Sequence, residues 1–147
     1  MNFTFRPLTM EYIKEIDSWN NDGFVEQVLM TPYFESVNKT GTLAGPGGCE
    51  GFAAFVDNET AGLFEFIIQG STMEIGLALK PDLIGRGLGV PFVNQGIEFG
   101  IQHYQLNFNY VKLSVDQKNK AAIRVYEKAG FEEVERTENE ITMRRIL

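Results

Sequence analysis

The sequence EIGLALKPDLIGRGLG, residues 74–89, joins two patterns that are each typical of one secondary structure. The alternation of apolar residues in its first half predicts a strand over residues 72–79. Three glycines, Gly85, Gly87 and Gly89, then precede residues that are spaced as on one face of a helix. The stretch therefore predicts a strand, a glycine-rich turn and a helix in direct succession.

The glycine-rich turn is suited to binding a phosphate group. Glycines let backbone N–H groups approach an oxyanion, and the N-terminus of the next helix adds partial positive charge. Arg86 adds a full positive charge. The spacing G-x-G-x-G differs from the dinucleotide pattern G-x-G-x-x-G, and the G-K-[ST] ending of a P-loop is absent. The turn alone indicates a phosphate-type ligand, and a plain strand-to-helix turn is the alternative.

Outward from this turn, apolar periodicity predicts a chain of strands with few helices. Thr9 can cap the first helix, and Gly130 can end the last one. Hairpin-linked strands before two late helices indicate a mixed α/β sheet rather than a doubly wound one. No linker or repeat divides residues 1–147, so we expect a single domain. The predicted strands are 2–7, 51–56, 61–69, 72–79, 109–115, 131–136 and 140–146, and the predicted helices are 10–19, one or two within 20–38, about 88–104 and 119–129.

Composition narrows the class of protein. Of the 147 residues, 44% are hydrophobic and 22% are charged, which is ordinary for a soluble globular protein. The net charge of −7 argues against a nucleic-acid partner and would suit a cationic acceptor, although solubility alone explains it more simply. No run approaches the ~18 apolar residues of a membrane span, and the first residues do not resemble a signal peptide. We therefore expect no membrane partner and a cytoplasmic location.

Nucleophilic and metal-ligating residues are scarce. The single cysteine, Cys49, has no metal-ligand spacing around it, so we expect a small buried residue. The single histidine, His103, lies at the end of a predicted helix, where we expect a surface position. The sequence predicts no metal site.

A second stretch, VKLSVDQKNKAAIRVYEKAGFEEV at residues 111–134, resembles the closing motif of the GNAT superfamily of acyl-CoA-dependent N-acetyltransferases. Residues 74–89 resemble the acetyl-CoA motif of the same family, which runs from a strand through Gln/Arg-x-x-Gly-x-Gly/Ala into a helix. One departure is Ile84, where the family usually has Gln or Arg; a side-chain contact is lost, but the backbone N–H remains. The matching residues of the closing motif are Asn119, Ala122, Tyr126, Glu127, Lys128, Gly130 and Phe131.

The resemblance implies a fold and a co-substrate. The implied fold is a central, mostly antiparallel sheet of six to seven strands with helices on both faces. This sheet is splayed between its fourth and fifth strands, so that the pantetheine arm of acetyl-CoA can pair with a free strand edge. Acetyl-CoA is the implied co-substrate, without a metal. The implied binding residues are Leu77, Ala78, Leu79, Ile84, Gly85, Arg86, Gly87, Leu88, Gly89, Asn119 and Tyr126.

The resemblance also implies that a primary amine attacks the thioester directly. Tyr126 matches the general acid that protonates the leaving thiolate, and a phenol with a pKa near ~10 suits that step. Helix packing is the alternative role for Tyr126. Glu74 lies where some members carry a general base, and Glu65 or a water chain is the substitute. A solvated or paired strand carboxylate is the alternative role for Glu74.

The acceptor amine stays open, from small amines such as polyamines, amino acids and aminoglycosides to a protein N-terminus. A homodimer is a further expectation for this family. Alternatives to an enzyme are a non-catalytic module that binds or senses acyl-CoA and a structural partner subunit. Aromatic and amide residues of the first helices could hold the amine or belong to the core: Trp19, Asn20, Asn21, Phe24, Tyr33 and Phe34.

Overall fold

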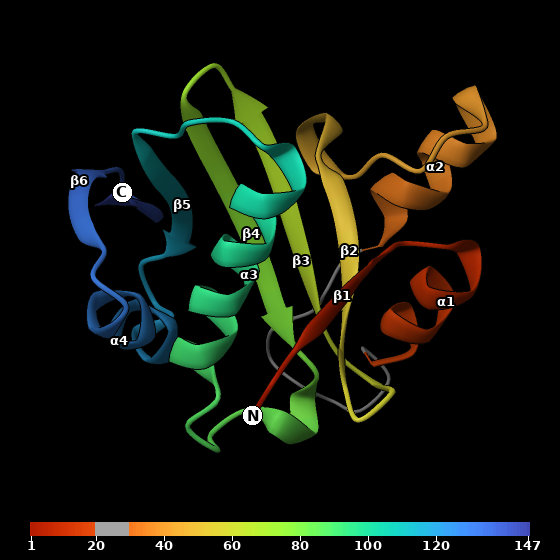
Figure 1. Cartoon of the computed structure of the whole chain (residues 1–147), viewed down its shortest axis with the longest axis horizontal. Coiled ribbons are helices and arrows are strands. Elements are labelled where there is room, and N and C mark those ends of the chain that lie inside the picture. The colour runs from red at the N-terminus through yellow and green to blue at the C-terminus, as the bar shows by residue number, and fades with distance from the viewer. Residues whose placement is uncertain (20–29) are drawn as a thin grey trace.

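The computed structural model describes residues 1–19 and 30–147, in which seven strands form one sheet of order β1-β2-β3-β4-β5-β7-β6 (Figure 1). All neighbouring strands are antiparallel except β4 and β5, which are parallel. The strands are β1 (Thr4–Pro7), β2 (Glu50–Val56), β3 (Glu59–Gln69), β4 (Thr72–Leu79), β5 (Tyr110–Asp116), β6 (Glu132–Arg136) and β7 (Glu140–Ile146). The helices are α1 (Met10–Ser18), α2 (Thr31–Thr40), α3 (Gly89–Tyr104) and α4 (Lys120–Lys128), with 3-10 turns η2 (Pro46–Gly48) and η3 (Pro81–Leu83).

Local sequence signals account for most element boundaries. The Thr9 side chain caps α1 by accepting a hydrogen bond from the Tyr12 N–H at 3.2 Å. Gly130, with φ of 94°, follows α4 as expected. One predicted boundary is too early. The helical segment expected to end at residue 38 ends at Thr40, the last residue of α2, because the next residue, Gly41, has a φ of 76° that leaves the helical region.

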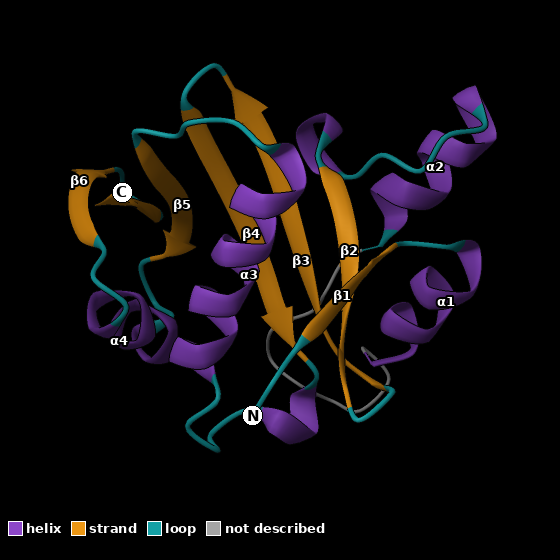
Figure 2. Ribbon diagram, viewed as in Figure 1, coloured by secondary structure: helices purple, strands orange, loops and turns teal. Residues whose placement is uncertain are grey.

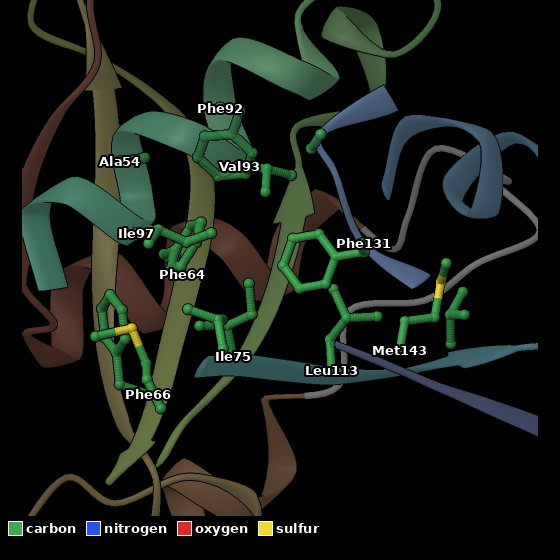
Figure 3. Close-up of a cluster of buried hydrophobic side chains, with 14 of the residues drawn as sticks. Ala54, Phe64, Phe66, Ile75, Phe92, Val93, Ile97, Leu113, Phe131 and Met143 are labelled. Carbon is green, nitrogen blue, oxygen red and sulfur yellow. The ribbon is translucent and has the colours of Figure 1, made fainter. Parts of the chain in front are cut away.

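Helices cover both faces of the sheet, as predicted (Figure 2). One core lies between the sheet and the helices α3 and α4, and it is rich in phenylalanine (Figure 3). In this core, α3 comes so close to β3 that a Cβ atom at Gly96 would overlap the Phe64 ring. A second core lies between the sheet and the helices α1 and α2; its buried members include Ile13, Ile16, Trp19, Tyr33, Cys49 and Phe55.

The sheet opens between its two parallel strands. Pairing of β4 with β5 is limited to Thr72–Glu74 opposite Tyr110–Lys112, so residues 75–79 of β4 have no partner on β5. On its other side β4 stays paired with β3 as far as Leu79. Figure 1 shows β4 and β5 moving apart toward the end where α3 begins. The predicted splay is confirmed, and it leaves backbone groups of β4 free along one edge.

Candidate active site

The glycine-rich turn follows directly after the free edge of β4. Gly85 and Gly87 have φ angles of 82° and 74°, a region that favours glycine. A Cβ atom at either glycine would meet nothing within 4 Å, and residues 84–87 are exposed. Leu88, the N-cap of α3, makes no side-chain capping bond, so donors of the first helical turn stay available. This is the geometry of an anion site at a helix N-terminus.

Two residues of the turn also make contacts within the protein. The N–H of Ile84 donates to the carbonyl of Pro81 at 3.2 Å, so it is already used within η3 and the available donors begin at Gly85. A Cβ atom at Gly89 would lie 2.9 Å from the Val125 side chain, so this glycine lets α3 approach α4. The Ile84 side chain is 58% exposed.

The motif residues on α4 lie beside the first core. Asn119 is the N-cap of α4, and its Oδ1 atom accepts from the Ala122 N–H at 3.1 Å. Tyr126 is partly buried and packs against Phe131, with 6.0 Å between ring centroids. Leu77, Ala78 and Leu79 are the last residues of β4, in the part that pairs with β3 but not with β5. The contacts of all these residues with a cofactor stay predictions.

A cavity of about 180 Å³ opens beside the start of the splay. Its wall residues Cys49 and Ile67 belong to the second core, so it lies mainly on that face of the sheet, and Ile75 of the first core closes it from the other side. Both candidate bases, Glu65 and Glu74, line it together with Ser114. The register pairs Glu65 with Gly76 and Ile67 with Glu74, so the two carboxylates share one face of neighbouring strands. The remaining wall residues are Pro46, Cys49, Ile75 and Gly76.

A lysine that the sequence did not predict at the site lies beside Glu74. Lys112 is its partner in the β4–β5 register, and the Lys112 Nζ atom lies 3.6 Å from Glu74 Oε1. The alternation of Val111 and Leu113 toward the core does place Lys112 on the opposite face. The parallel register that brings Lys112 to Glu74 is a long-range property, which no local pattern contains. The carboxylate of Glu74 is therefore partly neutralised.

Glu65 is held by a buried tyrosine. The Tyr33 hydroxyl donates to Glu65 Oε2 at 2.5 Å and lies 3.6 Å from the Cys49 Sγ atom. Burial, and next the negative charge of Glu65, raise the pKa of Tyr33 above its usual value. The same two causes raise the pKa of the Cys49 thiol to about 12. At neutral pH, Tyr33 is thus a proton donor and Cys49 is an un-ionised thiol, consistent with the small buried residue that was expected.

The aromatic residues expected at the acceptor site mostly belong to the core. Trp19 is 4% exposed and Tyr33 is 0% exposed, so neither ring faces an open pocket, and only the Tyr33 hydroxyl reaches a pocket residue. Phe34 is partly buried against the second core. Asn20, Asn21 and Phe24 lie outside the described residues.

His103 has the predicted surface position in the last turn of α3. Its Nε2 atom lies 4.0 Å from Glu50 Oε1, and its ring stacks on Phe99. Among residues 1–19 and 30–147, no group of three or more His, Cys, Asp or Glu could hold a metal ion. In the same part of the chain, no helix has the length and apolar character needed to cross a membrane.

Comparison with solved structures shows the same fold. A chimera of the spermidine N-acetyltransferase SpeG from Vibrio cholerae and hSSAT superimposes with a TM-score of 0.76 at 19% identity, covering 99% of this chain and 96% of that one. The Campylobacter jejuni N-acetyltransferase PseH in complex with acetyl coenzyme A gives a TM-score of 0.73 at 18% identity, covering 99% of both chains.

Comparison of sequences identifies the family. The protein "Uncharacterized N-acetyltransferase MJ1207" of Methanocaldococcus jannaschii is 39% identical over 57 residues, which are 39% of this chain and 24% of that protein. The model of the acetyltransferase (GNAT) family matches residues 13–131. This match spans most of the chain, including the splayed strands and the matching residues of both motifs as far as Phe131, so the resemblance found in the sequence is confirmed. The chain belongs to the acetyltransferase (GNAT) family.

Proposed function

We propose that this protein transfers the acetyl group of acetyl-CoA to a primary amine. The observation that carries the proposal is the unpaired edge of β4, residues 75–79, leading directly into an exposed turn with free backbone donors. A strand edge can pair with the two amides of pantetheine, and the turn beyond it can receive the pyrophosphate. A partner for pantetheine and a site for the pyrophosphate would therefore follow one another, from the edge of β4 to the turn after it.

The residues present fit acetyl-CoA. Leu77, Ala78 and Leu79 would offer backbone partners to pantetheine, and residues 85–89 with Arg86 would hold the pyrophosphate. When bound, acetyl-CoA supplies a thioester carbonyl to the amine and a thiolate as leaving group. Asn119 at the start of α4 and Tyr126 further along it would contact the same arm.

The protein supplies the proton transfers. Tyr126 would donate a proton to the departing sulfur, and a carboxylate of the cavity would accept the proton of the amine. Glu74 is the expected base, although Lys112 offsets its charge; Glu65 and a water chain are the substitutes. The splay between β4 and β5 supports this arrangement, because it opens the sheet between the cavity on one face and α4 on the other.

A cationic amine fits the acceptor side best. Two carboxylates line the cavity, and one of them is paired with Lys112, which leaves net negative charge there. Polyamines, amino acids, aminoglycosides and peptide N-termini all remain candidates, and the fold similarity to a spermidine N-acetyltransferase is a reason to test polyamines first. A cytoplasmic location and a homodimer stay predictions.

The second candidate is a module that binds acyl-CoA without turnover. It is favoured by one observation: Lys112 partly neutralises Glu74, the expected base.

A thiol-release assay with acetyl-CoA tests the proposal against spermidine, kanamycin, amino acids and a peptide with a free N-terminus, while calorimetry measures acetyl-CoA binding in parallel. Turnover on at least one amine is expected. Tight binding without turnover on any amine would identify the module, and no binding at all would contradict both candidates.

A further inference from the structure

We propose that Glu65, positioned by the hydroxyl of Tyr33, binds the ammonium group of the acceptor amine. The proposal rests on the proposed function, since it takes the cavity beside the splay as the acceptor site. The acceptor class that follows is a primary amine with one positive charge at the reacting end and an aliphatic body next to it.

The Tyr33 hydroxyl has a fixed position. Its ring is 0% exposed, and two backbone segments, at Gly45 and Gly51, approach it closely. A Cβ atom at Gly45 would lie 2.5 Å from the ring carbon Cζ, and one at Gly51 would overlap the hydroxyl. Glycine at both positions leaves just enough space for the phenol. The hydroxyl therefore holds one oxygen of Glu65 in place, as a positioning residue does.

The second oxygen of Glu65 lies over the free strand edge. Glu65 and Gly76 are directly paired in the β3–β4 register, and Gly76 belongs to the part of β4 that has no β5 partner. A Cβ atom at Gly76 would lie 3.0 Å from Glu65 Oε1, so any side chain there would press on the carboxylate. The carboxylate thus lies above the strand edge along which the pantetheine arm would run.

Glu65 and its neighbour Glu74 differ in whether a cation is paired with the carboxylate. Glu74 has Lys112 Nζ at 3.6 Å, whereas no cation pairs with Glu65 among the described residues, and its partners, the Tyr33 hydroxyl and the Cys49 thiol, are neutral. An ammonium group would supply the missing positive charge and donate a charge-assisted hydrogen bond to the carboxylate, whose Oε1 atom lies over Gly76. The surrounding walls are apolar at Ile67, which suits the aliphatic body of the acceptor.

The first test is kinetic, with the amine that the wild type acetylates fastest. Glu65→Gln should raise the KM for the amine about tenfold or more, because a charge-assisted hydrogen bond becomes a neutral one. Tyr33→Phe keeps the buried ring and should raise the same KM about threefold to tenfold. The KM for acetyl-CoA should stay unchanged in both variants.

A matched control exists elsewhere in the chain. Tyr104 donates to Glu50 Oε1, also at 2.5 Å, and neither residue lines the cavity. Tyr104→Phe and Glu50→Gln should leave the KM for the amine unchanged. An unchanged KM in Glu65→Gln, or an equal rise in the control variants, would overturn the proposal.

The second test needs neither acetyl-CoA nor turnover. Wild-type protein labelled with ¹³C at the glutamate carboxyl groups is titrated with butylammonium chloride and, separately, with 1-butanol. The Glu65 signal, assigned from Glu65→Gln, should shift saturably with butylammonium only, and the Glu50 signal should not shift. A shift of Glu74 while Glu65 stays constant would overturn the proposal. If no amine in the panel is acetylated, the proposed function fails, and this titration still decides whether Glu65 binds an ammonium.

Discussion

The phosphate-binding role of the glycine turn can be tested by replacing Gly87 with valine. Gly87 has φ of 74°, and a Cβ atom there would point into open space. A non-glycine residue in this region costs about 1–2 kcal/mol, and a branched residue lies at the upper end. If the pyrophosphate binds these backbone donors, the branched side chain also occupies the approach path of the phosphate.

Gly41 provides the matched control, because strain alone would also lower stability. It ends α2 with φ of 76°, and a Cβ atom there likewise meets nothing within 4 Å. Gly41→Val and Gly87→Val should therefore lower the melting temperature by similar amounts. Only Gly87→Val should weaken acetyl-CoA binding, by tenfold or more, which corresponds to at least ~1.4 kcal/mol.

Isothermal titration calorimetry of acetyl-CoA against the wild type and both variants measures this difference. Equal affinities of the wild type and Gly87→Val would refute the assignment of the turn as the pyrophosphate site. Equal losses in both variants would show that the strain, and not the position of the side chain, weakens binding.

Three further predictions concern the acid, the thiol and the packing of α3. Tyr126→Phe should lower kcat by about 10²–10⁴-fold with little change in acetyl-CoA affinity, and less so with donors whose thiols are more acidic; full turnover on every donor would exclude the general-acid role. The pKa of Cys49 is about 12 in the folded chain against an ordinary value of 9.0, so folding favours the un-ionised thiol. Above pH 9 the thiol ionises first in the unfolded chain, and the free energy of unfolding therefore falls by up to ~1.4 kcal/mol per pH unit as far as pH 12. Urea unfolding from pH 8 to 11 should show a shallower decline in Cys49→Ala, and identical slopes would contradict the assignment. Gly96→Ala should lower the free energy of unfolding, because the added Cβ atom would overlap the Phe64 ring. This loss should outweigh the ~1 kcal/mol by which alanine is the better helix former. An equal or greater stability in urea unfolding would be inconsistent with the close approach of α3 to β3.

Two contacts of the glycine-rich turn were not expected from the sequence. Gly89 was expected in the phosphate turn, and the structure shows that it allows α3 to approach Val125 of α4. The Ile84 N–H was expected to be available, but the turn at Pro81 uses it. The Gly89 contact depends on how the two helices pack, whereas the Ile84 bond closes a local 3-10 turn that begins at Pro81 and that the sequence pattern did not predict.

The sequence by itself determined the elements and the family. The alternation in residues 72–79 and the positive-φ glycines at 85 and 87 depend on backbone preferences, which act over a few residues and are visible in any one segment. The tertiary structure alone decided which side chains meet. Strand register brings Lys112 to Glu74, and packing of α2 on the sheet brings Tyr33 to Glu65. These pairs are 38 and 32 residues apart in the chain. Their geometry follows from the burial of two cores at once, a property of the whole fold that no single segment encodes.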